Sequence, residues 1–477
     1  MGEEILTSQF DEQDYRDYRV RLEQETMRLQ EIFEQDMFDK DQAFGGLEQE
    51  AWLINAAATP SPDNNILLNH LPSDVISPEL AKFNFELNVT PQLLRGDGIR
   101  LMQQELQASW DRCEELAAEQ GDKIVMIGIL PTLVDDDLTL KHMSPLNRYR
   151  ALNEQVMLAR KGLPLQLDIQ GKEHLVSQHT DVMLESAATS FQVHRQIPAQ
   201  KSRRYYNAAI IASAATVAIG ANSPYFLGRS LWEETRIPLF ERAVETGGYG
   251  EAARGPIKRV GFGNGYAHKS VFECFQENLD HFPILLPVTL DESTERLPYL
   301  RLHNGTIWRW NRPLIGFDKN NKPHLRIEHR VIAAGPTIVD EMANTAFFFG
   351  LQEYLASTDT PPELQLEFSS AKDNFYEAAR LGIKAKNLWL DGKRIILKQL
   401  ILEQLIDAAK SGLQRLGVDT ELSHHYLSII EQRVKSGQTG AQWQRAFVEK
   451  YKADMPTLTK AYLEKQKSQR PVHEWSL

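Results

Sequence analysis

The feature that most constrains the fold is a series of short alternating stretches whose charged residues all fall on one side. In GLEQE (residues 46–50), Glu48 and Glu50 are two positions apart, so both point to one face of a sheet if the stretch is a strand. The stretch KFNFELNV (residues 82–89) alternates in the same way and sets Glu86 opposite Phe85. Like charges on one face repel each other and weaken a strand. The pattern predicts a sheet with one apolar face and an opposite face on which carboxylates are concentrated.

Two later stretches extend the charged face. TSFQVHRQI (residues 189–197) places Gln192 and His194 on one side, and HLRIEHRVI (residues 324–332) does the same with Glu328 and Arg330. Any one of these stretches is explained by a sheet with one face in water. A solvated face is usually rich in lysine and threonine, however, whereas these faces combine four glutamates with a histidine. Carboxylates and a neutral imidazole suit Mg²⁺ or Mn²⁺, so the pattern suggests a metal site without excluding a solvated face.

Composition excludes several classes of protein. The chain of 477 residues has 65 acidic against 53 basic residues, and its formal net charge of −12 disfavours nucleic-acid binding. Two cysteines are too few for a disulfide framework or a cysteine-based zinc site, and they fit a reducing compartment. The first twenty residues lack the pattern of a signal peptide, and the longest apolar run, residues 208–221, is too short to span a bilayer. We therefore expect a cytoplasmic protein that binds neither nucleic acid nor membranes.

The spacing of apolar residues divides the chain into three parts. It predicts an N-terminal helix within residues 11–40 and mostly helices from Asp340 onward. The part between them mixes strands, turns and a few helices, among them a small-residue helix near residues 200–220 that we expect to be buried. The glycine-rich stretch GFGNGYAHKS (residues 261–270) is explained better by a hairpin or a mobile lid than by a phosphate-binding loop. Cys113 lies on an amphipathic helix, where a packing role is expected.

Six blocks of the sequence, in order, resemble the signature blocks of the carboxylate–amine ligase branch of the glutamate–cysteine ligase family: GLEQE, FELNVTPQ, TSFQVH, ANSPYFLG, WNRP and RIEHRV. NFYEAARLGI and GQTGAQWQR resemble later blocks, so the resemblance covers about residues 43–446. It implies a glutamine synthetase-like α+β fold, in which a curved antiparallel β-sheet forms a cup with helices on its outer face. The implied organisation is an N-terminal helical segment (1–42), a catalytic domain (43–355), a helical C-terminal region packed on that domain (356–468) and a loose tail (469–477).

The resemblance implies an ATP-dependent ligase that joins the γ-carboxylate of L-glutamate to an amine through an acyl phosphate. Cysteine is the default acceptor, which would place the chain in glutathione biosynthesis. Two or three Mg²⁺ (or Mn²⁺) ions would hold the triphosphate. Arg330 would stabilise the transferring phosphoryl group, and Glu79 would orient the amine or accept its proton, although SPELAKF (residues 77–83) also fits a helical turn. The implied metal ligands are Glu48, Glu50, Glu86, His194 and Glu328.

By the same resemblance, three residues would contact substrates: Gln192, Arg236 and Arg312. Without it, Arg312 is equally well explained as part of a surface turn before a proline. Trp308 and Trp310 either pack against adenine or substrate or lie in the core, the usual place for tryptophan. Residues 227–245 and 247–288 depart from the family pattern, as does Asn311, and these departures leave the acceptor amine open.

Two other classes of function remain open. One is a guanidino or amine phosphotransferase on the related fold, which would stop at phosphoryl transfer. The other is a non-catalytic nucleotide- or metal-binding protein, although the presence of both Glu328 and Arg330 argues against a decayed site. The expected partners are small molecules, namely ATP, L-glutamate and an amine. The sequence leaves open whether glutamate is the true acid substrate and whether the chain forms a homo-oligomer.

Overall fold

The computed structural model of the chain describes residues 4–39, 43–246 and 258–477. Within these residues, seven strands form one curved sheet in which every pairing is antiparallel. Six of them follow one another in the order β12 (Asn311–Phe317), β13 (Pro323–Ala333), β7 (Ser190–Ile197), β1 (Phe44–Ile54), β3 (Asn84–Leu93) and β2 (Ile76–Pro78). The seventh, β4 (Lys123–Val125), pairs with the end of β1. The four stretches predicted from their alternation are thus β1, β3, β7 and β13.

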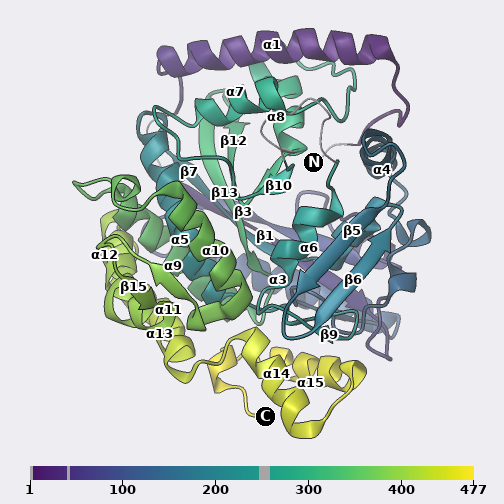
Figure 1. Cartoon of the computed structure of the whole chain (residues 1–477), viewed down its shortest axis with the longest axis vertical. Coiled ribbons are helices and arrows are strands. Elements are labelled where there is room, and N and C mark those ends of the chain that lie inside the picture. The colour runs from purple at the N-terminus through teal and green to yellow at the C-terminus, as the bar shows by residue number, and fades with distance from the viewer. Residues whose placement is uncertain (1–3, 40–42, 247–257) are drawn as a thin grey trace.

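Three long helices cover the apolar face of the sheet (Figure 1): α3 (Gly98–Glu119), α5 (Ser202–Ile219) and α9 (Ile338–Ala356). Phe85 and Leu87 on β3 are fully buried on this face, as the alternation predicts. Small residues let α5 pack closely, and it is buried over nearly its whole length. Gly350 on α9 lies so close to α12 (Ile406–Leu416) that a side chain there would collide with the carbonyl oxygen of Ala409. The predicted α+β fold with a curved antiparallel sheet and outer helices is confirmed.

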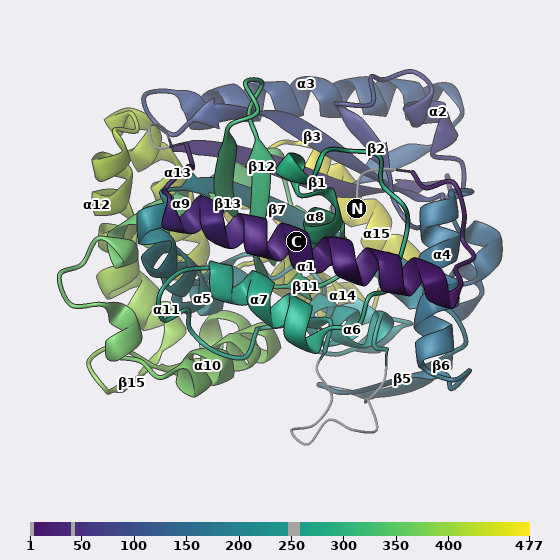
Figure 2. The ribbon, with the colours of Figure 1, turned by 90° about the horizontal axis from the view of Figure 1, so that it is seen from above.

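Three helices lie on the charged side of the sheet: α1 (Glu12–Glu34), α7 (Phe272–His281) and α8 (Pro298–Gly305). The predicted N-terminal helix is therefore confirmed, and it packs against both α7 and α8 along the top of Figure 1. Seen from above, it runs across the molecule (Figure 2). The Tyr18 hydroxyl donates to Tyr299 O at 2.8 Å, and Glu25 accepts from Leu300 N at 2.8 Å. These bonds attach α1 to the first turn of α8.

Shorter elements complete the central part of the chain: α2 (Asn65–Leu68), α4 (Asn147–Ala159), the 3₁₀ helix η3 (Val182–Ala187), α6 (Arg236–Ala243), and the strand pairs β5 (Leu165–Gln170) with β6 (His174–His179), β8 (Tyr225–Phe226) with β9 (Arg229–Ser230), and β10 (Val260–Gly261) with β11 (Trp308–Arg309). Cys113 is buried on α3, as expected for a packing residue. None of the helices in the described ranges is long and apolar enough to cross a membrane.

The C-terminal part is mainly helical, as predicted: α10 (Phe368–Leu381), α11 (Leu397–Leu400), α12, α13 (Thr420–Ser436), α14 (Gly440–Tyr451) and α15 (Met455–Lys467). Between α10 and α11, β15 (Arg394–Ile396) pairs with β14 (Lys386–Leu388). The expectation of a loose tail is wrong. Trp475 is buried and packs edge-to-face against Trp443 and Tyr462, with ring centroids 5.3 and 5.2 Å apart.

Candidate active site

The register of the sheet brings most of the predicted site residues together. Glu50 on β1 lies directly opposite Glu86 on β3, and Glu328 on β13 lies directly opposite His194 on β7. Arg312 on β12 is the partner of Glu328 on the other side. The three glutamates and Arg312 line a cavity of about 520 Å³, to which α4, α7, α8 and η3 contribute the opposite wall. Residues far apart in sequence therefore meet in one cavity on the charged face.

The first cluster consists of Glu48, His194 and Glu328, whose ligand atoms all lie within 4.8 Å of one another. His194 Nε2 is 3.2 Å from Glu48 Oε1 and 3.8 Å from Glu328 Oε1, yet it is buried without a hydrogen-bond partner in the described part of the chain. Burial opposes ionisation of Glu48, but His194 outweighs it and lowers the pKa of Glu48 to about 2. Burial also opposes ionisation of Glu328, and Arg312 and Arg330 lower its pKa far below the usual range. Both carboxylates are therefore charged.

The second cluster consists of Glu50, Glu79 and Glu86, again with ligand atoms within 4.8 Å of one another. Ser190 fixes Glu50, since its N–H and its hydroxyl donate to the two carboxylate oxygens at 2.6 and 2.8 Å. Burial, and then the neighbouring carboxylates, raise the pKa of Glu79 well above its ordinary value and that of Glu86 to about 8. The three carboxyl groups therefore repel one another when charged, and a cation among them would relieve the repulsion.

The two clusters suit divalent cations of the Mg²⁺ or Mn²⁺ type. Both offer hard oxygen ligands, and the first adds the buried imidazole nitrogen of His194, which lies 3.2 Å from Glu48 Oε1 but makes no hydrogen bond within the described residues. Glu79 completes the second cluster because it directly follows β2, in which Ser77 pairs with Glu86 of β3. The alternative prediction that Glu79 lies in a helical turn is wrong.

Two arginines and a glutamine connect the clusters. Arg312 is buried and donates two hydrogen bonds to Glu328, at 2.8 and 2.9 Å, so it does not lie in an exposed turn. Arg330 Nη1 donates to Gln192 Oε1 and lies 3.4 Å from Glu328 Oε2. Gln192 in turn donates to Glu50 at 2.8 Å. Fixed positive charge thus lies beside the first cluster, and Gln192 links it to the second.

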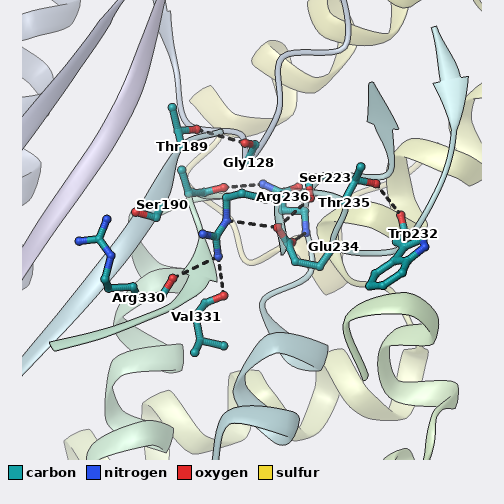
Figure 3. A network of polar contacts seen from close by, with 12 residues as sticks. Gly128, Thr189, Ser190, Ser223, Trp232, Glu234, Thr235, Arg236, Arg330 and Val331 are labelled. Carbon is teal, nitrogen blue, oxygen red and sulfur yellow. Dashed lines mark hydrogen bonds and ion pairs between the residues drawn. The ribbon is translucent and has the colours of Figure 1, made fainter. Parts of the chain in front are cut away.

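Of the other residues considered for substrate contact, Arg236 and Trp310 lie apart from the cavity. Arg236 is not among its lining residues in the described ranges; its buried guanidinium donates to the carbonyl oxygens of Arg330 and Val331 instead (Figure 3). Trp308 lines the cavity, whereas Trp310 is fully buried in the core. The structure thus separates the two tryptophans that the sequence left undecided.

The glycine-rich stretch 261–270 does not form the hairpin considered above. Its first residue belongs to β10, which pairs in parallel with β11. Gly261, Gly263 and Asn264 line a separate cavity of about 380 Å³. Residues 247–257, the first part of the distinctive insert, lie outside the described residues.

Two residues that line the cavity, Glu185 and Arg326, were given no role from the sequence. Glu185 lies on η3, and its carboxylate lines the cavity without a hydrogen bond or ion pair to any described side chain. Burial, followed by nearby Glu50, raises the pKa of Glu185 to about 7. Arg326 lines the cavity from β13, two residues before Glu328. The alternation of residues 324–332 places Arg326 on the charged face with Glu328 and Arg330, but no pattern marks Glu185, because it is not part of a strand.

The chain has a curved antiparallel sheet with carboxylate clusters on one face and helices packed on the other face. This architecture is that of a glutamine synthetase-like fold. Within that class, the model of glutamate–cysteine ligase family 2 (GCS2) matches residues 45–469, and the chain belongs to this family. A search of curated protein sequences returned no match.

Two solved structures are similar over most of the chain. The glutamate–cysteine ligase (gshA) of Francisella tularensis, in complex with AMP, is 14% identical, with a TM-score of 0.59 over 91% of this chain and 90% of that chain. A bifunctional glutathione synthetase from Pasteurella multocida is 11% identical, with a TM-score of 0.57 over 94% of this chain and 55% of that chain, so this chain spans about half of it. At these identities the similarity shows the fold.

Proposed function

We propose that this protein is an ATP-dependent carboxylate–amine ligase that joins the γ-carboxylate of L-glutamate to an amine, with cysteine as the default acceptor. The observation that carries the proposal is the presence of two carboxylate clusters in one cavity, linked by Arg330 and Gln192. Membership of the GCS2 family supports a ligase. The AMP in the structure of the Francisella tularensis relative supports an adenine nucleotide as a substrate.

The first cluster and its arginines suit the phosphate end of ATP. Mg²⁺ or Mn²⁺ ions held by the two clusters would neutralise phosphate oxygens and make the γ-phosphorus more electrophilic. Arg330 faces the cavity beside Glu328, where its fixed charge would stabilise the transferring phosphoryl group. Arg312 holds Glu328 through two hydrogen bonds and compensates its charge.

The part of the cavity around Glu79 and Glu185 suits the amine. In the proposed reaction, a γ-carboxylate oxygen of glutamate attacks the γ-phosphorus and ADP leaves. The bound ammonium ion of the acceptor then gives up a proton to Glu79, which frees the lone pair on its nitrogen. That nitrogen attacks the acyl carbon, phosphate leaves, and the second proton of the nitrogen passes to the departing phosphate. Glu79 and Glu185 lie near one another at this end of the cavity. Glu185 would attract the acceptor as an ammonium ion, because its carboxylate has no partner among the described residues. Glu79 would orient the amine toward the acyl carbon.

An apolar part of the cavity wall supports a water-sensitive intermediate. Tyr149 and Leu152 from α4 and Leu286 and Leu290 from the segment before α8 line the cavity. An acyl phosphate hydrolyses when water reaches it, so these side chains would protect it by limiting the space for water.

The test is phosphate release from ATP with Mg²⁺ and L-glutamate, measured across a panel of amines that includes cysteine. Release that requires glutamate and is greatest with one amine would support the ligase and identify its acceptor. Glu50→Gln should abolish the release while the variant still folds, as judged by circular dichroism. Glu154→Gln, which changes an exposed carboxylate on α4, should retain it.

The other two classes give different results in the same assay. A phosphotransferase on the related fold would leave the phosphoryl group on a stable phosphorylated amine, with no free phosphate. A non-catalytic protein would bind Mg²⁺–ATP and turn none over. Phosphate release that is indifferent to both glutamate and amine would contradict the ligase.

A further inference from the structure

β13 is irregular at the point where it passes the two clusters. His329 pairs with Val193 on β7, but the next pair along is Ile332 with Phe191. β13 therefore has one residue more than β7 over this interval. Two residues of β13, Arg330 and Val331, lie opposite a single residue of β7. Such an insertion is a β-bulge, which interrupts the hydrogen-bond ladder and re-aims the side chains beside it.

The main-chain groups of the bulge bind partners outside β7. Arg330 N donates to Trp310 O at 2.9 Å. The carbonyl oxygens of Arg330 and Val331 both accept from Arg236 Nη2, at 3.3 and 2.5 Å (Figure 3). Buried carbonyl groups need a donor, and one guanidinium supplies it to two consecutive residues. Arg236 is thus bound to the part of β13 that carries Arg330.

Arg236 is itself held from several sides. It is 2% exposed at the start of α6, and its Nε lies 3.3 Å from Glu234 Oε1. Glu234 is fully buried and is fixed by Asn222 N and the Ser223 hydroxyl at 2.9 and 2.7 Å. The Arg236 guanidinium also lies over the ring of Trp310, 5.3 Å from its centroid. A side chain held in this way is not available to bind a substrate in the cavity.

We propose that Arg236 is a positioning residue: it holds the bulge of β13 and so directs Arg330 toward Gln192 and Glu328. This inference rests on the proposed function, in which Arg330 stabilises the transferring phosphoryl group. It replaces the substrate contact that the family resemblance implied for Arg236. Without the guanidinium, the two carbonyl groups lose their donor, the bulge relaxes, and Arg330 loses its alignment.

Arg236→Lys tests the role, because lysine keeps a positive charge but has only one nitrogen. It therefore lacks the planar fork with which Arg236 contacts Glu234 through Nε and both carbonyl groups through Nη2. We expect kcat to fall about 10²-fold, the effect of displacing a catalytic group by about 1 Å, with little change in KM for ATP and L-glutamate. An unchanged kcat would overturn the proposal. So would a loss confined to a raised KM for L-glutamate, which would restore Arg236 as a substrate ligand.

Arg445→Lys is the matched control. Arg445 is likewise buried, pairs with Glu233 at 3.2 Å, and donates to the carbonyl oxygens of Leu231 and Trp232 at 2.8 and 3.0 Å. It does not line the cavity among the described residues. Its replacement should cost comparable stability and leave kcat close to the wild-type value. An equal loss of kcat in both variants would show a merely structural role and overturn the proposal.

Hydrogen–deuterium exchange of the peptide over residues 328–335 gives a readout that does not depend on activity. We expect faster exchange in Arg236→Lys than in the wild-type chain and Arg445→Lys, without any ligand; wild-type exchange would overturn the proposal. If the wild-type chain released no phosphate with any amine, the proposed function would fail, but exchange would still decide whether Arg236 holds the bulge.

The double variant R236M/E234Q removes both buried charges together. If Arg236→Lys does not fold, we expect this double variant to show the same faster exchange.

Discussion

Replacing Glu86 by glutamine tests whether the second cluster is destabilising without cations. Glu86 lies directly opposite Glu50, and its pKa is raised from 4.5 to about 8, first by burial and then by Glu48 and Glu50. With rising pH, the unfolded chain releases this proton near pH 4.5, whereas the folded protein keeps it until about pH 8. The unfolded state therefore binds fewer protons in this window, and the free energy of unfolding falls as pH rises.

The size of the effect follows from the same shift. Each pH unit inside the window lowers the free energy of unfolding by about 1.4 kcal/mol, so by pH 7 the loss is about 3 kcal/mol. Glutamine has nearly the same shape, carries no charge and can still accept the hydrogen bond from Ser77, which is 3.0 Å long. We therefore expect metal-free Glu86→Gln to unfold a few degrees above the wild-type protein at pH 7. The difference should shrink toward pH 4.5.

Thermal unfolding followed by circular dichroism, first with EDTA and then with Mg²⁺, measures both parts of this prediction. Mg²⁺ should stabilise the wild-type protein, because it binds only the folded state, and should stabilise Glu86→Gln much less. Glu154→Gln should match the wild-type protein in both conditions, since its carboxylate is exposed on α4. The reasoning would be refuted if Glu86→Gln unfolded below the wild-type protein in EDTA at pH 7, or if Mg²⁺ stabilised both equally.

Arg312→Lys should lower kcat by about tenfold or more, because lysine cannot make the two hydrogen bonds to Glu328. Steady-state phosphate release measures kcat, and a wild-type value would contradict this prediction. Glu185→Gln should raise KM for an acceptor that binds as an ammonium ion but not for hydroxylamine, a largely neutral nucleophile; parallel assays decide, and equal changes for both would count against the role. Glu25→Gln should stabilise the protein above about pH 7, because burial raises the pKa of Glu25 from 4.5 to about 7 and the wild-type protein loses stability between these values. Unfolding temperatures across this range check that sign, and an unchanged pH profile would contradict it.

The strands and their faces were predictable because a period of two is a local property. Phe85 and Leu87 are buried on one face and Glu86 lies on the other, as their alternation requires. Strand order and register were not predictable in the same way, since they depend on pairings between separate stretches, and β7 pairs with β1 and β13 across more than a hundred positions. That Glu328 meets His194 could be inferred from the family resemblance but not from either stretch alone.

The sequence was least informative where side chains are placed by loops and bulges. Glu79 follows a three-residue strand, too short for any periodic pattern, and Glu185 lies on a 3₁₀ helix. Arg236 is charged and close in sequence to a family block, which suggested a substrate contact. Its actual partners are main-chain oxygens at a bulge, and a bulge in a distant strand leaves no mark in the sequence around Arg236.

The two clusters differ in how the protein itself compensates their charge. Around Glu328, Arg312 and Arg330 supply positive charge, so the carboxylate is ionised without any ion. From the described residues, Glu86 receives only a hydrogen bond from the Ser77 hydroxyl, and its pKa is raised to about 8. Carboxylates must be deprotonated to ligate a metal ion. A cation that enters the second cluster near neutral pH must therefore displace a proton, whereas one that enters the first need not, so pH should control the occupancy of the second cluster more strongly than that of the first.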